Sequence, residues 1–127
     1  MTSVLIAEDD PAIATLLADT LSDRLATRVV ANGALVPDAL AASRPDLLVL
    51  DLSLPGLSGL DVFDLVRNDP AWQGILVLFL TADPERARRA FDPTGACLVM
   101  GKPFDVDELI AAVDGMLALA KRAEAAA

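Results

Sequence analysis

The sequence predicts an α/β fold in which parallel strands form one sheet with helices on both faces. Short apolar runs alternate along the chain with segments whose apolar residues recur at helical spacing, which is the pattern of repeated strand–helix units. The runs at 47–50 and 75–80 are apolar throughout, as expected of central strands covered on both faces. The 127 residues suit a single domain with a proper hydrophobic core.

Each expected strand is one of these short apolar runs. The strands cover residues 3–8, 28–31, 47–51, 75–80 and 97–100. Asn32-Gly33 stops the second run, because both residues favour turns.

The segments between the strands, and the one after the last strand, predict helices. The first begins at Pro11, whose fixed φ suits a first turn. Its expected apolar stripe consists of Ile13, Leu16, Leu17, Leu21 and Leu25. The other helices are expected at 37–43, from the loop 52–59 to a stop at 68–70, at 84–91 and at 105–121. The helix at 84–91 is short in this interpretation, because Asp92-Pro93 breaks it.

Composition excludes several classes of protein. With 54% hydrophobic and 23% charged residues the chain is not disordered, and no apolar stretch approaches the roughly 20 residues of a membrane span. A net charge of −9 disfavours direct binding to nucleic acid, whose phosphates require basic residues. The absence of histidine excludes Ser-His-Asp and Cys-His catalysis. The lone Cys97 and the lack of a secretory signal fit a reducing cytoplasm.

Polar residues follow four of the expected strands. Glu8-Asp9-Asp10 follow the first, Asp51 ends the third, Thr81 follows the fourth, and Gly101-Lys102 follow the fifth. Taken singly, an acidic pair or an Asp after a strand is more often a turn or a helix cap. Four such groups in register point to a site, because the carboxyl ends of parallel strands meet where open α/β folds bind ligands.

These residue types fit metal-dependent phosphoryl transfer. Two carboxylates about 4 Å apart repel by roughly 4 kcal/mol at an effective dielectric constant of 20, so the cluster needs a cation. Mg²⁺ prefers one or two carboxylates together with water and phosphate oxygens. A carboxylate can accept a phosphoryl group, and the loose transition state needs mainly positioning and neutralisation by a metal and a lysine.

The chain resembles the receiver domain of bacterial two-component response regulators from Val4 to about Leu119. The matching motifs are Leu5 to Asp10, Asp51 to Gly59, Leu80-Thr81-Ala82 and Gly101 to Phe104. The resemblance implies a flavodoxin-like (βα)₅ fold, a doubly wound five-stranded parallel sheet with strand order 2-1-3-4-5. The receiver domain would cover residues 1–122, with a C-terminal tail at 123–127.

The resemblance also implies a role for each site residue. Asp51 would be the phosphoacceptor. Asp9, Asp51 and the backbone carbonyl of Ser53 would bind Mg²⁺ directly, and Glu8 would act through water. Lys102 would pair with the phosphoryl group, and Thr81 would be the switch hydroxyl.

The Lys102-Pro103 bond is usually cis in this family. The chain departs from the family at Val99, where a switch aromatic is usual, and at Cys97-Leu98, where an acidic pair is usual. The stretch 81–95 is about one residue short, and about two extra residues precede Asp38. These departures affect the output surface rather than the acidic cluster.

The resemblance implies that a histidine kinase or a histidine phosphotransfer protein donates the phosphoryl group to Asp51. The domain would then slowly hydrolyse its own acyl phosphate and switch the surface formed by the helix at 84–91, the last strand and the last helix. It would signal through protein contacts, alone or as part of a longer regulator, and would not act as a metabolic enzyme. The downstream partner is unidentified, and a homodimer is left open.

Two rival functions are compatible with the same fold class. One is a receiver-like interaction module that is never phosphorylated, which the missing aromatic at Val99 favours and the complete acidic set disfavours. The other is a flavin-binding or phosphatase domain of the same fold. A flavin phosphate would need a cradling loop after the first strand, and the acidic Glu8-Asp9-Asp10 would repel it.

Overall fold

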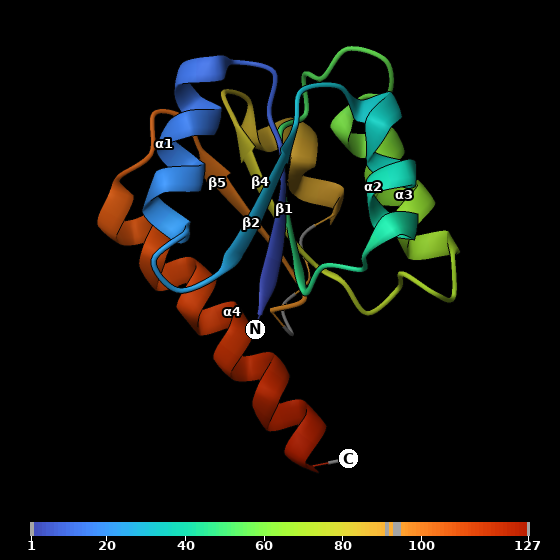
Figure 1. Cartoon of the computed structure of the whole chain (residues 1–127), viewed down its shortest axis with the longest axis vertical. Helices are drawn as coiled ribbons and strands as arrows, with labels where there is room; N and C mark the ends of the chain where they lie inside the picture. The colour runs from blue at the N-terminus through green and yellow to red at the C-terminus, as the bar shows by residue number, and fades with distance from the viewer. Residues whose placement is uncertain (1, 91, 93–94, 127) are drawn as a thin grey trace.

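The computed structural model of the chain describes residues 2–90, 92 and 95–126, and it contains one sheet of five parallel strands (Figure 1). The strand order is β2-β1-β3-β4-β5, as the family resemblance implied. The strands are β1 (Ser3–Ala7), β2 (Ala26–Val30), β3 (Leu47–Leu50), β4 (Leu76–Thr81) and β5 (Cys97–Gly101). The central β3 is buried along its whole length, which explains its continuous apolar sequence.

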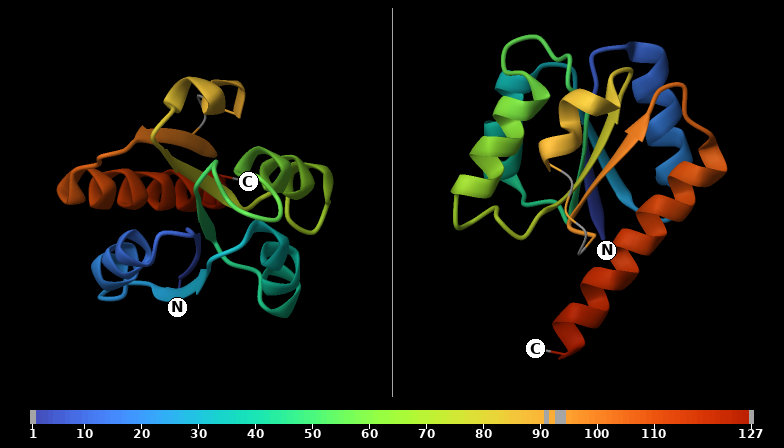
Figure 2. Two further views of the ribbon diagram at one scale, coloured as in Figure 1. Left: turned by 90° about the horizontal axis from the view of Figure 1, so that it is seen from above. Right: turned by 180° about the vertical axis from the view of Figure 1, so that it is seen from behind.

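Helices cover both faces of the sheet (Figure 2). They are α1 (Pro11–Leu21), the 3₁₀ turn η1 (Gly33–Leu35), α2 (Val36–Ala42), α3 (Gly59–Asn68), the 3₁₀ helix η2 (Pro84–Ala90) and α4 (Val106–Ala126). One core lies between the sheet and α1 and α4; the other lies between the sheet and α2, α3 and η2. Among the described residues, no helix is both long and apolar enough to cross a membrane.

The strands and most helices lie within two residues of their expected ends, and three details differ. Leu16 is 45% exposed, so its place in the predicted α1 stripe was wrong; the buried residues of α1 are Ala14, Leu17 and Leu21. Leu25 is buried, but it lies beyond the end of α1. β2 begins two residues early at Ala26, which pairs with Ser3, so the strand includes the polar Thr27 that the prediction left out.

The segment before β5 forms the 3₁₀ helix η2 rather than an α-helix. Its predicted last residue, Phe91, and the predicted breakers Pro93-Thr94 lie outside the described residues. Gly95 is described, and its φ of 90° suits glycine at a helix-terminating turn.

The last helix, α4, continues to Ala126, well beyond the expected end at Lys121. Its final turns are rich in alanine, the residue with the highest helix propensity. The predicted tail is therefore helical up to Ala126, and this part of α4 projects past the end of the sheet (Figure 1).

The loop after β3 is held in place by close backbone contacts. The amide of Gly33 donates to the carbonyl oxygen of Pro55 at 2.9 Å, and the amide of Gly59 donates to that of Leu52 at 2.8 Å. A Cβ at Gly33 would lie 1.8 Å from the carbonyl oxygen of Leu57. The loop directly after Asp51 is therefore fixed against the turn between β2 and η1.

Arg67 joins the end of α3 to the start of two strands. Its guanidinium donates to the carbonyl oxygens of Gln73, Ile75 and Ala96 at 3.0, 2.7 and 3.2 Å. The same group lies 5.1 Å from the ring centroid of Phe63. Burial lowers the pKa of Arg67, but it stays charged because arginine begins far above neutral pH.

We expect Arg67→Met to lower the free energy of unfolding by about 2 kcal/mol, because three carbonyl groups lose a charged donor. Urea unfolding measures the change. Arg86→Met, at an exposed position on η2, is the matched control and should change stability by less than about 0.5 kcal/mol. Equal losses in the two variants would contradict the bracing role of Arg67.

Candidate functional site

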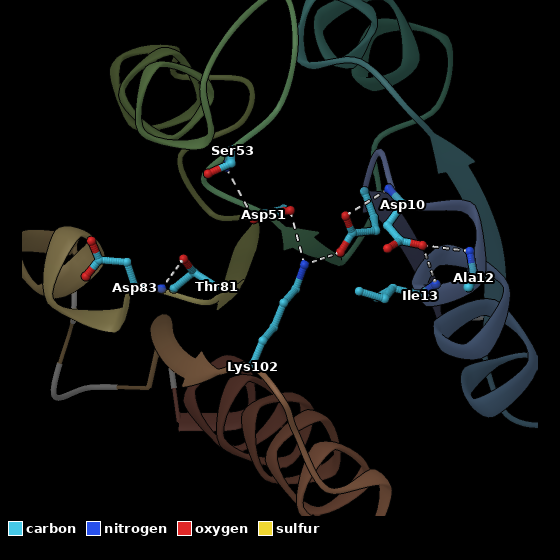
Figure 3. A network of polar contacts seen from close by, with 9 residues as sticks. Asp10, Ala12, Ile13, Asp51, Ser53, Thr81, Asp83 and Lys102 are labelled. Carbon is cyan, nitrogen blue, oxygen red and sulfur yellow. Dashed lines mark hydrogen bonds and ion pairs between the residues drawn. The ribbon is translucent and has the colours of Figure 1, made fainter.

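Polar side chains that the sequence singled out gather at the carboxyl edge of the sheet (Figure 3). Among the described residues, the buried polar or charged side chains are Glu8, Asp51 and Thr81, and each stands at the end of a different strand. Lys102 reaches the same edge from the end of β5. Since burying polar groups is costly without partners, their concentration at one edge marks this as the candidate site.

Lys102 bridges the two buried carboxylates. Its Nζ donates to Oε1 of Glu8 at 2.5 Å and to Oδ2 of Asp51 at 3.1 Å. Burial opposes the charge of this ammonium, but the hydrogen bonds to Glu8 and Asp51 outweigh burial and raise the pKa of Lys102. The lysine is therefore charged at neutral pH and neutralises part of the acidic site.

Glu8 is only 2% exposed, and both of its carboxylate oxygens have partners. Oε1 accepts from Lys102, and Oε2 accepts from the amide of Asp10 at 3.2 Å. Burial raises the pKa of Glu8, the two hydrogen bonds oppose that rise, and the nearby charge of Asp51 adds to it. The neighbouring ammonium of Lys102 therefore helps Glu8 to keep its negative charge.

Glu8, Asp9 and Asp51 form an acidic cluster that could hold a metal ion. Each offers one carboxylate oxygen, and these oxygens lie within 4.8 Å of one another. Asp9 is exposed, so the cluster opens to solvent on that side. Three carboxylates facing one ammonium leave an excess of negative charge that a divalent cation would offset.

Asp10 has a different task from its two neighbours. Its Oδ1 accepts from the amides of Ala12 and Ile13 at 2.9 and 3.3 Å, so it caps the N-terminus of α1. The capping signal was present in the sequence, because an aspartate directly before Pro11 fits a cap followed by proline at the first helical position.

Ser53 and Thr81 lie beside the cluster and are held by backbone contacts. The amide of Ser53 donates to Oδ1 of Asp51 at 3.2 Å. The hydroxyl of Thr81 accepts from the amide of Asp83 at 3.0 Å, and its carbonyl oxygen accepts from the amide of Lys102 at 2.8 Å. Thr81 therefore connects the site to the start of η2 through the Asp83 amide.

Two further features concern the end of the sheet. The Lys102-Pro103 peptide bond is cis, as the family resemblance implied. Val99 pairs with Phe79 across β4 and β5, and it packs against the core on the α2, α3 and η2 side. A small side chain thus stands where the family usually has an aromatic ring.

Comparisons with known proteins agree on one family. A family model described as "Response regulator receiver domain" matches residues 4–114. The DNA-binding response regulator MtrA of Mycolicibacterium smegmatis is 34% identical over 116 residues, which cover 90% of this chain and 50% of that protein. The DNA-binding dual master transcriptional regulator RpaA of Synechocystis is 38% identical over 120 residues, covering 92% of this chain and 49% of that protein. The chain thus spans about half the length of these relatives.

A solved structure supports the same assignment. The signal receiver domain of a signal transduction histidine kinase from Syntrophus aciditrophicus superposes with a TM-score of 0.81 at 27% identity. The superposition covers 93% of this chain and 91% of that chain.

We expect Lys102→Met to lower the free energy of unfolding of the metal-free protein by about 2 kcal/mol at neutral pH. Without the lysine, the pKa of Glu8 rises further, so the folded chain binds a proton that the unfolded chain has released. The loss should therefore grow as the pH rises from about 4.5 towards neutrality.

Urea unfolding with a chelator present, at about pH 5 and about pH 7, measures this dependence. Lys121→Met, at an exposed position on α4, removes the same charge outside the site and should show no such dependence. A loss for Lys102→Met that is equal at both pH values would contradict the role of Lys102 as the counter-ion of Glu8.

Proposed function

The chain belongs to the response regulator receiver domain family, and on that basis we propose that Asp51 accepts a phosphoryl group from a partner's phosphohistidine. The donor would be a histidine kinase or a histidine phosphotransfer protein. The observation that carries the proposal is the convergence of Glu8, Asp9, Asp51 and Lys102 at one edge of the sheet, with Lys102 in contact with Asp51. This set joins a carboxylate acceptor to a fixed positive charge and to the acids that a cation requires.

The transfer exchanges one bond for another. A carboxylate oxygen of Asp51 forms a bond to phosphorus, the phosphorus–nitrogen bond of the donor breaks, and the imidazole leaves with the bonding electron pair. Asp51 then carries an acyl phosphate, which water cleaves slowly to inorganic phosphate and the restored carboxylate. The domain therefore acts on itself and serves signalling rather than metabolism.

The residues present fit a bound Mg²⁺. Asp9, Asp51 and the backbone carbonyl of Ser53 would hold it directly, and Glu8 would contact it through water. When bound, Mg²⁺ supplies positive charge to the phosphoryl oxygens during transfer. The amide of Ser53 holds one oxygen of Asp51, which fixes the orientation of the acceptor carboxylate.

Lys102 supplies the remaining positive charge. Its ammonium lies between Glu8 and Asp51, so a small movement of a flexible side chain takes it to an oxygen of the new phosphoryl group. Asp51 loses its own negative charge on phosphorylation, and the lysine then pairs with the phosphoryl oxygens.

Thr81 would transmit the change to η2. Its hydroxyl oxygen accepts from the amide of Asp83, and a movement of the hydroxyl towards a phosphoryl oxygen, to which its O–H would donate, would pull on this contact. Val99 is too small to follow that movement as an aromatic ring would. The response therefore passes through the backbone at Asp83 into η2 rather than through a side chain on β5.

The output depends on partners outside this domain. The relatives MtrA and RpaA are named as DNA-binding regulators, and the chain covers about half of each. We propose that any such activity lies outside this domain, because its net charge of −9 opposes contact with nucleic-acid phosphates.

We expect acetyl phosphate with Mg²⁺ to phosphorylate the native chain once, and Asp51→Asn to abolish the modification, because an amide oxygen is a far poorer acceptor. Intact-mass measurement detects the added phosphoryl group. Asp61→Asn, an exposed aspartate on α3, is the matched control and should be labelled like the native chain. Equal labelling of Asp51→Asn would overturn the assignment, and no labelling of any variant would favour an unphosphorylated interaction module.

We expect Mg²⁺ to raise the melting temperature of the native chain by several degrees, since binding at 100 times Kd adds about 2.7 kcal/mol to stability. Asp9→Ala should remove most of this rise, and it should stabilise the metal-free chain by relieving repulsion within the acidic cluster. Asp19→Ala removes an exposed charge from α1 and should keep the full response to Mg²⁺. An equal Mg²⁺ response in Asp9→Ala and Asp19→Ala would place the cation elsewhere.

A further inference from the structure

The 3₁₀ helix η2 has little apolar packing to hold it. Its buried residues are Ala87 and Ala90, and an alanine removes little apolar surface from water. The amide of Asp83, just before η2, is bound to the hydroxyl of Thr81. The position of η2 therefore depends on polar contacts to an unusual degree.

One of these contacts joins η2 to a different helix. The guanidinium of Arg89 meets the carboxylate of Asp64 on α3 in a two-pronged ion pair, with NH1 to Oδ1 at 3.2 Å and NH2 to Oδ2 at 3.1 Å. The two side chains are 54% and 50% exposed. This parallel arrangement is the geometry that favours arginine over lysine.

The neighbouring ion pair on η2 provides a contrast. Arg88 pairs with Glu85 three residues earlier, and these side chains are 79% and 77% exposed. Both lie on η2 itself and both are mostly exposed, so this pair contributes little to stability and cannot fix η2 to the rest of the domain. The Arg89–Asp64 pair thus connects η2 to α3, whereas the Arg88–Glu85 pair connects two residues of η2.

The helix at the other end of the Arg89 contact is firmly anchored. Arg67 binds α3 to the starts of β4 and β5 through three carbonyl oxygens. At the first residue of α3, a Cβ on Gly59 would lie 2.2 Å from the carbonyl oxygen of Asp51. Because α3 is fixed to the sheet at both ends, it provides a stationary support for η2, which lies beside β5 (Figure 2) and meets α3 through the Asp64–Arg89 pair.

We propose that the Asp64–Arg89 ion pair is a latch that holds η2 in its unphosphorylated position and restrains activation of the domain. The restraint on activation rests on the proposed function; the restraint on η2 does not. The Thr81–Asp83 contact lies just before η2 and the ion pair lies near its end, so a displacement of η2 as a unit must break or stretch the ion pair as well. Opening the pair lowers the free energy of the rearranged state relative to the resting state, so ligands that favour rearrangement bind more tightly.

Hydrogen exchange of the amides in residues 85–90, without any phosphoryl analogue, tests the restraint on η2. Asp64→Asn and Arg89→Gln should each speed exchange about two- to fivefold, the range that a partly exposed ion pair supplies. Arg88→Gln opens the pair within η2 and should leave the tether to α3 unchanged, so its exchange should stay near the native rate. The exchanged pair, Asp64→Arg with Arg89→Asp, should restore slow exchange.

Titration with beryllofluoride and Mg²⁺ tests the restraint on activation. Kd should fall about two- to fivefold in Asp64→Asn and Arg89→Gln, and it should return towards the native value in the exchanged pair. These residues lie outside the acidic cluster, so the change cannot arise from altered ligation.

The hydrogen-exchange experiment decides whether the ion pair restrains η2, and the titration decides whether it restrains activation. The latch is overturned if amides in η2 exchange hydrogen at the same rate in Asp64→Asn and Arg88→Gln. It is also overturned if the double variant Asp64→Arg with Arg89→Asp fails to restore the slow hydrogen exchange. Faster exchange with an unchanged Kd overturns its restraint on activation. If beryllofluoride binds neither the native chain nor any variant, the proposed function fails, and the exchange measurements still decide whether the ion pair holds η2.

Discussion

The placement of Lys102 between the carboxylates of Glu8 and Asp51 is the interaction on which the rest of the site depends. Glu8 and Asp51 are 2% and 7% exposed, so their charges are held largely out of water. Such a pair would repel strongly without a counter-ion. The lysine supplies it, but one ammonium does not neutralise three nearby acids. The remaining negative charge is the property that makes the edge receptive to a cation, so stability and function draw on the same imbalance.

The fold makes this excess of negative charge possible, because it brings residues that are distant in the sequence to one edge of the sheet. Parallel strands with helical crossovers put the ends of β1, β3, β4 and β5 at one edge. The cost is that loops at this edge must be held firmly, because a displaced acid would leave a buried charge unpaired. Backbone contacts meet this need: Gly33 binds Pro55, Gly59 binds Leu52, and the amide of Ser53 holds Asp51. Small residues are required where backbones approach so closely.

The sequence predicted the sheet, most element boundaries and the residues that meet at its edge, because these depend on apolar runs and on the polar residues directly after each run. It did not predict contacts between elements. Leu16 has the right residue type for the α1 core yet faces solvent, since burial depends on where α4 and the sheet lie. Asp10 adjoins the acidic cluster but caps α1. The 3₁₀ form of η2 and the Asp64–Arg89 pair depend on how the elements pack in space, so no local sequence pattern indicates either of them.

Under the proposed function, the presence of Val99 in place of an aromatic ring would make signalling depend on the backbone and on surface charge. A ring that turns between two positions stores its two states in side-chain packing. Val99 has no comparable freedom, since a β-branched side chain on a strand has few rotamers. Two states of this domain must then differ in the position of a segment, and η2 is suited to that because it buries only alanines. For the proposed switch, a lightly packed segment would need a restraint that is strong enough to define the resting state and weak enough for one phosphoryl group to overcome. A partly exposed, two-pronged ion pair to a fixed helix has that intermediate strength.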